Sequence, residues 1–232
     1  MQLLDDTPEP SQNLAFCKSM RRRRRQTFPT QLPMATLSNL REWGSDPSSS
    51  MLLAQGQGIK KSSLDFSLDF LDAILDRDYP VIWALPGDND RGQPTPSITG
   101  ILGFLISQLL ELEPASGAAS NGPSPVRLRQ LQGNTDIRHW FQLLERCIAF
   151  FPCLCIFIDT SLLKFSLEDE ARDGGCFTLT AFIDRMSEIV TRRDKDELKV
   201  LVVSWKFDTT TSMEASDVFK DMQFATIMGR RV

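Results

Sequence analysis

The chain has 232 residues, of which 41% are hydrophobic and 24% charged, and this balance fits one globular domain with tails better than two full domains. A formal net charge of -4 and a pI near 5.2 give no general attraction to nucleic acid or to anionic membranes. No stretch approaches the roughly 18 consecutive apolar residues of a membrane span, and the acidic, proline-containing N-terminus does not match a secretory signal. We therefore expect an intracellular, cytoplasmic protein for which nucleic acid is an unlikely partner.

The N-terminal residues 1–33 are polar and aperiodic, which predicts a disordered basic tail. An unbroken basic run of this kind is typical either of a nuclear localisation signal or of an electrostatic tether, so a nuclear location stays open. A solvated tail without any address explains the run equally well. The run consists of Arg21, Arg22, Arg23, Arg24 and Arg25.

Apolar runs and helical periodicities alternate along the rest of the chain. A short helix at 37–43 precedes a strand at 50–55, and a helix follows from the N-cap candidates Ser62 and Ser63 to residue 76. Further strands are predicted at 79–85, 153–158 and 198–204, and further helices at 97–112, 136–150 and 178–192. Strands that are apolar at every position and separated by helices indicate a parallel sheet covered on both faces. We predict an α/β fold, a three-layer sandwich with a mainly parallel sheet.

The cysteines and the single histidine leave little material for metal or nucleophilic chemistry. Five cysteines, an odd number, agree with a reducing compartment. Cys153 and Cys155 lie two residues apart in an apolar run, and no second Cys/His pair completes a zinc site, so we predict buried structural thiols. His139 stands at the beginning of a helical pattern, which favours a helix-start position over catalysis.

The junction between the first strand and its helix has the order of a phosphate-binding loop: strand, glycine turn, helix N-terminus. In such loops a lysine contacts the β- and γ-phosphates, and the next hydroxyl binds Mg²⁺. The nucleotide-binding candidates here are Gly56, Gly58, Lys60, Lys61, Ser62 and Ser63.

The pattern G-x-x-x-x-G-K-[ST] is nevertheless not met. When Lys61 and Ser62 are aligned with its last two positions, Lys60 stands where glycine is required and Gly56 comes one residue too late. A side chain then occupies a place where the backbone must approach the phosphate or take positive φ. A plain glycine turn before a helix is an equally good interpretation of this segment alone.

Two later strands end in polar residues that such a site uses. Asp159 ends a buried strand, where P-loop NTPases hold the acid that positions Mg²⁺, and Ser62 would supply the hydroxyl ligand. No second acid follows until Glu168, which argues against efficient hydrolysis. Ser204 and Lys206 end the last predicted strand, where γ-phosphate sensing residues lie in these folds.

Four segments together carry a family resemblance: LLAQGQGIKKSSLDFSLDFLDAIL, SITGILGFLISQLLELEP, WFQLLERCIAFFPCLCIFID and LKVLVVSWKFD. Their order and spacing resemble the NACHT-type, or nephrocystin-like, modules of large fungal signalling proteins, which belong to the STAND class of P-loop NTPases. The resemblance implies Walker A roles for Lys61 and Ser62, a Walker B role for Asp159 and sensor positions at Ser204 and Lys206. It also implies ATP or GTP with Mg²⁺ as cofactor. Each motif departs from the family pattern.

The sequence therefore predicts a degenerate NACHT-like signalling module. We expect a core at 37–207 and, at 208–232, the C-terminal extension of a truncated module whose sheet is incomplete at that end. Weak or no nucleotide binding, little or no hydrolysis and action through other proteins, including self-association, are expected, with no confident catalytic residue. The alternatives are an active Mg²⁺-dependent NTPase switch and a purely structural α/β scaffold. Titration with nucleotide would distinguish either alternative from a degenerate module.

Overall fold

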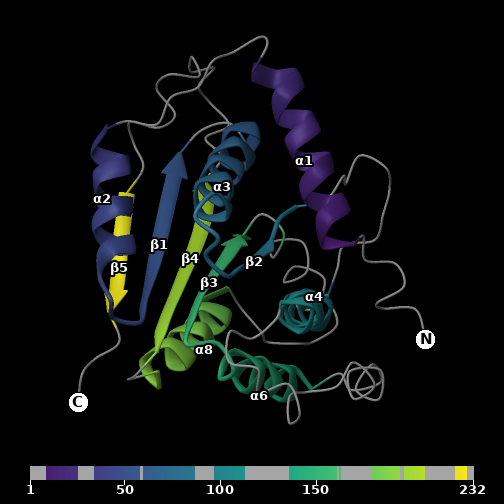
Figure 1. Cartoon of the computed structure of the whole chain (residues 1–232), viewed down its shortest axis with the longest axis vertical. Helices are drawn as coiled ribbons and strands as arrows, with labels where there is room; N and C mark the ends of the chain where they lie inside the picture. Colours follow the sequence, from purple (N-terminus) through teal and green to yellow (C-terminus); the bar gives the residue numbers. More distant parts are fainter. Residues whose placement is uncertain are drawn as a thin grey trace.

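The structure is a computed structural model that describes residues 9–25, 34–57, 60–86, 97–112, 136–160, 162, 179–193, 196–206 and 223–228. Helices and strands alternate along these ranges, and the helices surround one sheet (Figure 1). The first elements are α1 (Pro10–Arg25), α2 (Met34–Ser45), β1 (Ser50–Gln57), α3 (Lys60–Leu75), β2 (Val81–Ala84) and α4 (Ile98–Glu111). The remaining elements are α6 (Ile137–Ile148), β3 (Cys153–Asp159), α8 (Leu179–Thr191), β4 (Glu197–Lys206) and β5 (Gln223–Met228).

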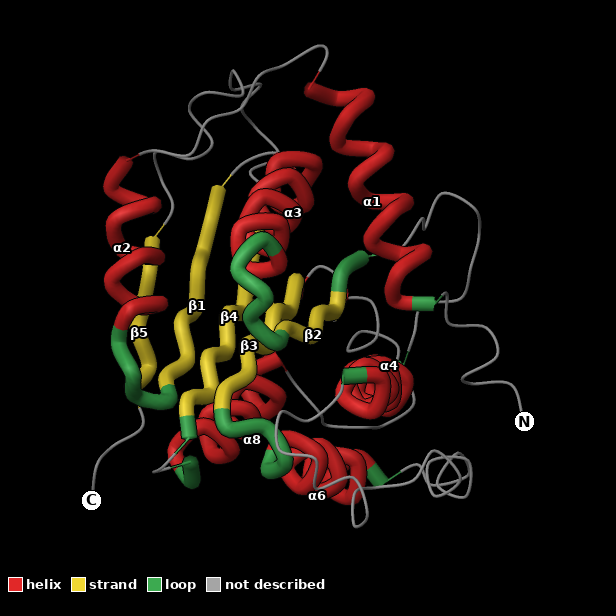
Figure 2. Tube along the Cα trace, in the orientation of Figure 1, coloured by secondary structure: helices red, strands yellow, loops and turns green. Residues whose placement is uncertain are grey.

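The strands form one five-stranded sheet in the order β2-β3-β4-β1-β5 (Figure 2). The strands β2, β3, β4 and β1 are parallel to one another, whereas β5 pairs antiparallel with β1 at the edge. This arrangement confirms the predicted α/β fold with a mainly parallel sheet. The chain passes from β1 to β2 at the opposite edge and then returns strand by strand, so that β4 is inserted between β1 and β3.

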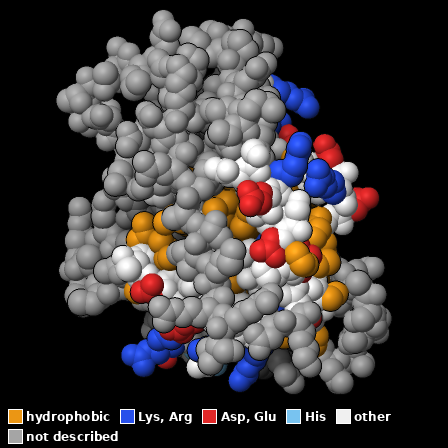
Figure 3. Space-filling view, turned by 90° about the vertical axis from the view of Figure 1, so that its left-hand side faces the viewer, with side chains coloured by type: hydrophobic (Ala, Val, Ile, Leu, Met, Phe, Trp, Pro, Cys, Tyr) orange, Lys and Arg blue, Asp and Glu red, His pale blue; other side chains and the backbone are white. Residues whose placement is uncertain are grey.

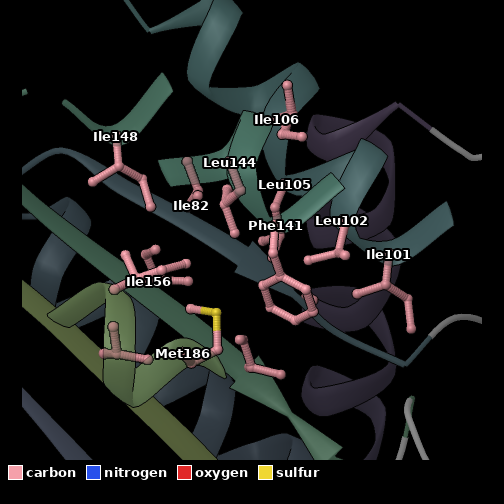
Figure 4. Packing of buried hydrophobic residues seen from close by; sticks show 14 of the residues in the cluster. Ile82, Ile101, Leu102, Leu105, Ile106, Phe141, Leu144, Ile148, Ile156 and Met186 are labelled. Carbon is pink, nitrogen blue, oxygen red and sulfur yellow. The ribbon is translucent and has the colours of Figure 1, made fainter. Parts of the chain in front are cut away.

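The sheet separates two apolar layers because successive strand residues point to opposite faces. On one face, α4, α6 and α8 cover residues such as Met51, Ile82 and Val200. On the other face, α3, α1 and Trp43 of α2 cover residues such as Leu52 and Phe157. Figure 4 shows the first layer, with Ile101, Leu102, Leu105, Ile106, Phe141, Leu144 and Met186 packed around Ile82 and Ile156. Burial on both faces explains why the central positions of these strands are mostly apolar.

Local hydrogen bonds account for several helix ends. Ser97 begins α4 as an N-cap whose side chain accepts from the Gly100 N–H at 3.0 Å, and Asp136 begins α6 by accepting from the Arg138 N–H at 3.0 Å. Asp78, just after α3, adopts φ 52°, the left-handed conformation that often ends a helix. His139 lies in the first turn of α6, as predicted for a helix-start residue.

The short edge strand β2 is capped by a side chain from α4. Gln108 accepts from the Trp83 N–H at 3.0 Å and donates to the Trp83 carbonyl at 2.8 Å, which reproduces the two hydrogen bonds of a neighbouring strand. Gln108 is 4% exposed, and its amide thus has strong partners in an otherwise apolar helix. A polar residue in the buried face of α4 therefore closes this edge of the sheet against further pairing.

Three details differ from the sequence prediction. The predicted disordered tail is wrong for Pro10–Arg25, which form α1 and bury Leu14 and Cys17 against the α3 side of the sheet. The extension predicted at 208–232 contributes β5 to the sheet. The predicted loop at 56–63 is mostly strand and helix, because pairing with β4 carries β1 on to Gln57 and α3 already begins at Lys60. Ser62 and Ser63 are therefore helical residues rather than N-caps.

Candidate functional site

The carboxyl ends of β1, β4 and β3 form the edge of the sheet at which the sequence-predicted residues meet. The helix after β1, α3, covers one face, while the next long helix after β3, α8, covers the other. In α/β sheets, ligands bind outside the carboxyl ends of the strands at the point where the connections diverge to opposite faces. This edge is therefore the candidate functional site.

The strand register brings the predicted residues of separate motifs together. Gly56 of β1 pairs with Trp205 of β4, one residue from both Ser204 and Lys206. On the other side of β4, Asp159 pairs with Val203, one residue before Ser204. Because neighbouring strands lie about 4.8 Å apart, these positions share one edge of the sheet. The Lys206 side chain lies outside the described residues, so its place is known for the backbone alone.

Asp159 is the most buried acid of this edge. It is 1% exposed, and its Oδ2 accepts a hydrogen bond from the Ser67 hydroxyl of α3 at 3.3 Å. Ser67 is itself fully buried, and it fixes the carboxylate of β3 to the helix that follows β1. The predicted metal acid Asp159 is thus joined by a direct contact to the helix that follows the predicted phosphate loop.

Sequence reasoning missed Ser67. It stands four residues before Leu71 on the inward face of α3, between the buried Phe66 and Leu68. A small hydroxyl residue between the apolar Phe66 and Leu68 was the signal that could have identified it, because buried polar side chains need a partner. The sequence prediction assigned the hydroxyl role to Ser62, one and a half turns earlier in the same helix.

The strand-to-helix junction is shorter than the predicted loop. Gly58 and Ile59 alone separate β1 from α3, and both lie outside the described residues. Lys60, Lys61, Ser62 and Ser63 occupy the first turn of α3, although their side chains are not described. The first-turn N–H groups of a helix have no partner within the helix and carry the positive end of its dipole.

A hydrated magnesium ion does not fit the described acid. Mg²⁺ demands octahedral oxygen coordination and usually keeps several waters, whereas the Asp159 carboxylate is 1% exposed and already accepts from Ser67. Within the described ranges, no group of three or more His, Cys, Asp or Glu side chains is placed to hold a metal ion.

Three of the four described cysteines are buried: Cys17, Cys147 and Cys155. Burial raises the pKa of the Cys147 thiol to about 11 and that of Cys155 to about 12, so both stay protonated near neutral pH. Cys155 is buried as predicted, while Cys153 is half-buried at the beginning of β3. These thiols therefore pack as small apolar side chains and supply no nucleophile to the edge.

A second buried charged residue, Lys199, lies at the amino ends of the strands, opposite the candidate site. Lys199 of β4 is 3% exposed, and its Nζ donates to the Trp43 carbonyl at 2.9 Å, the Ser48 carbonyl at 2.9 Å and Ser50 Oγ at 3.0 Å. Its ammonium also lies 5.5 Å from the Trp43 ring centroid. Burial lowers the pKa of Lys199, partly offset by the carboxylate of Asp46. All three ammonium protons have acceptors, so Lys199 joins the α2–β1 connection to β4.

Comparison with protein-family models, with curated proteins and with solved structures found no match to the chain. Among the helices described, none combines the length and the apolar character that crossing a membrane requires.

Proposed function

We propose that this chain is a degenerate P-loop-like signalling module that binds ATP or GTP weakly at the carboxyl edge of its sheet. The observation that carries the proposal is the strand order with its register. With β4 between β1 and β3, the start of α3, Ser204 and Asp159 belong to one edge. The four sequence segments that resemble fungal NACHT-type modules of the STAND class contribute these same elements, which supports the assignment.

Phosphate binding rests on the start of α3. Its unpaired N–H groups and the positive end of its dipole favour an anion there. Lys60 and Lys61 add positive charge to the same turn, and Ser204 and Lys206 lie at the end of the adjacent strand β4. The N–H groups of the first turn of α3 are retained although Lys60 stands at the Walker glycine position, so a weak anion site is compatible with the altered motif.

Little or no hydrolysis is expected from this edge. Activation of water in P-loop NTPases needs a hydrated cation and a residue that orients the attacking water. Asp159 is buried and accepts from Ser67, which supports a positioning role between β3 and α3. The module would then signal through contacts with other proteins, including copies of itself, that depend on whether nucleotide is bound.

Titration of a fluorescent ATP or GTP analogue, with and without Mg²⁺, tests the proposal. Binding in the micromolar to millimolar range is expected, weakened by Lys61→Ala because a charge beside the phosphates is lost. Arg77→Ala is the matched control, since it removes one exposed positive charge just beyond the other end of α3. Absence of binding at millimolar nucleotide, or equal loss in both variants, would contradict nucleotide binding and leave the scaffold alternative.

Phosphate release measured on the same protein tests the alternative that the chain is an active Mg²⁺-dependent NTPase switch. We expect no turnover above background with either nucleotide, in the presence of Mg²⁺. Turnover that is lost in Asp159→Asn would establish an active Mg²⁺-dependent NTPase, because only a catalytic metal acid has to remain ionised for that reaction. The fold of Asp159→Asn is checked by its far-UV circular dichroism.

A further inference from the structure

The helix α1 docks on the body of the protein through two different kinds of contact. Its first half buries Leu14 and Cys17 in the α3-side layer, and the Cys17 thiol donates to the Pro86 carbonyl at 3.7 Å. Its second half contacts α3 through charges. Arg21 donates to Asp69 at 2.8 Å and to Asp72, and Lys18 lies 2.7 Å from Asp72. Figure 1 shows α1 beside α3 over the same side of the sheet.

The two charged pairs are matched in spacing. Lys18 and Arg21 are three residues apart on α1, and Asp69 and Asp72 are three residues apart on α3, so each pair lies on one face of its helix. Burial alone would raise the pKa of Asp72, but hydrogen bonds from Lys18 and Arg21 outweigh it and lower that pKa. We call this four-residue contact the α1–α3 latch.

Solvent reaches three of the four side chains of the latch. Exposed side-chain fractions are 34% for Lys18, 32% for Asp69 and 30% for Asp72, while only Arg21 is more buried, at 13%. Ion pairs that solvent reaches contribute little, commonly less than about 1 kcal/mol each. A competing set of carboxylates could therefore replace Asp69 and Asp72 without unfolding the apolar half of the contact.

Positive charge remains on α1 after the latch is formed. Arg22 and Arg23 are exposed, and they lie at the C-terminal end of the helix, where the dipole favours cations. In the space-filling view, Lys and Arg side chains gather next to Asp and Glu side chains on the upper right of the molecule (Figure 3). This basic surface stands on a chain whose net charge is -4, so its attraction for an anion is local.

We propose that α1 binds an acidic segment of a partner protein through Lys18, Arg21, Arg22 and Arg23. In the absence of that partner, Asp69 and Asp72 form ion pairs with Lys18 and Arg21. The chemistry of the partner follows from the latch, in which helix-borne carboxylates three residues apart satisfy the basic side chains. A nucleic acid fits less well, because its dense phosphate charge would also lie over the acids of α3.

Fluorescence anisotropy with the full chain tests the proposal. The probe is a helical peptide of about 15 residues with aspartates three residues apart, compared with its asparagine counterpart. Asp69→Asn together with Asp72→Asn removes the internal competitor, so the aspartate peptide should bind about three- to tenfold more tightly. Asp76→Asn with Asp184→Asn removes two exposed acids outside the latch and should change the affinity less than twofold, about what unpaired surface charges contribute.

Removal of the exposed arginines tests the surface itself. Arg22→Gln with Arg23→Gln should weaken the aspartate peptide about tenfold, whereas Arg77→Gln with Arg146→Gln, two exposed arginines elsewhere, should leave it nearly unchanged. Equal affinity of the wild type and the Asp69/Asp72 variant would overturn the competition. An unchanged affinity of the Arg22/Arg23 variant, or tighter binding of a charge-matched oligonucleotide than of the peptide, would overturn the assignment of the surface.

Discussion

At the amino end of the parallel strands, Lys199 donates to three oxygen atoms of the α2–β1 segment, while at the carboxyl end Asp159 accepts from Ser67 of α3. Both charged residues are almost fully buried, at 3% and 1% exposure. Lys199 connects the α2–β1 segment to β4. Asp159 lies at the end of the sheet from which the chain continues into α3 on one face and α8 on the other. Burial of a charge does not by itself identify a functional residue. The position of that charge relative to the crossovers distinguishes the candidate site.

The largest effect is expected from Lys199→Met. The substitution leaves the carbonyls of Trp43 and Ser48 without their donor in a buried place. We expect the free energy of unfolding, measured by urea denaturation, to fall by about 3 kcal/mol. The affinity for nucleotide should stay unchanged, because Lys199 lies at the amino ends of the strands, away from the carboxyl ends where nucleotide is proposed to bind. A loss below about 0.5 kcal/mol would show that Lys199 does not hold the amino end together.

A smaller effect is expected at the carboxyl edge from Ser67→Ala. The lost donor to Asp159 should lower the free energy of unfolding by about 1 kcal/mol, because the 3.3 Å hydrogen bond is long but buried. A double-mutant cycle with Asp159→Asn isolates the coupling between the two side chains. A coupling energy as large as the loss expected for Lys199→Met would contradict the contrast between the two ends of the sheet, because Asp159 would then stabilise the fold as strongly as Lys199 does.

The smallest effect concerns the partly exposed Asp72 of the α1–α3 latch. Its folded-state pKa lies below the ordinary value of 3.8, because hydrogen bonds from Lys18 and Arg21 outweigh the effect of burial. The stability that Asp72 contributes is therefore present above that pH and is lost as the pH falls through the folded pKa. The difference in unfolding free energy between the wild type and Asp72→Asn should be constant at neutral pH, remain below about 1 kcal/mol, and shrink in acid. A difference that grows as the pH falls would contradict the ion pairing.

The α/β fold was largely predictable from the sequence because its signals are strong. Residues 153–158 are apolar at every position, and residues 198–204 are apolar except at Lys199 and Ser204, a pattern typical of strands covered on both faces. The helix α1 was not predictable in the same way. Its stability depends on burying Leu14 and Cys17 and on pairing Arg21 with acids 48 and 51 residues away, which local composition does not record.

The candidate site was predictable in part. Asp159 was identified from its place at the end of a buried strand, and the register confirms that Asp159 and Ser204 share one edge. The contact between Asp159 and Ser67 was not predicted, because the loop pattern indicates Ser62 as the hydroxyl of the site and carries no signal for Ser67. Pairing of Gly56 and Gln57 with β4 extends the strand and shortens the loop, and this depends on a strand about 150 residues later in the chain.

Backbone hydrogen–deuterium exchange with and without ATP tests most directly whether the start of α3 binds phosphate. The N–H groups of Lys60, Lys61, Ser62 and Ser63 should exchange more slowly with saturating nucleotide, because the phosphates accept from them. The start of α4, whose Gly100 N–H already has Ser97 as acceptor, is the internal control and should not change. Unchanged exchange at the start of α3, or equal slowing at both helices, would contradict the account.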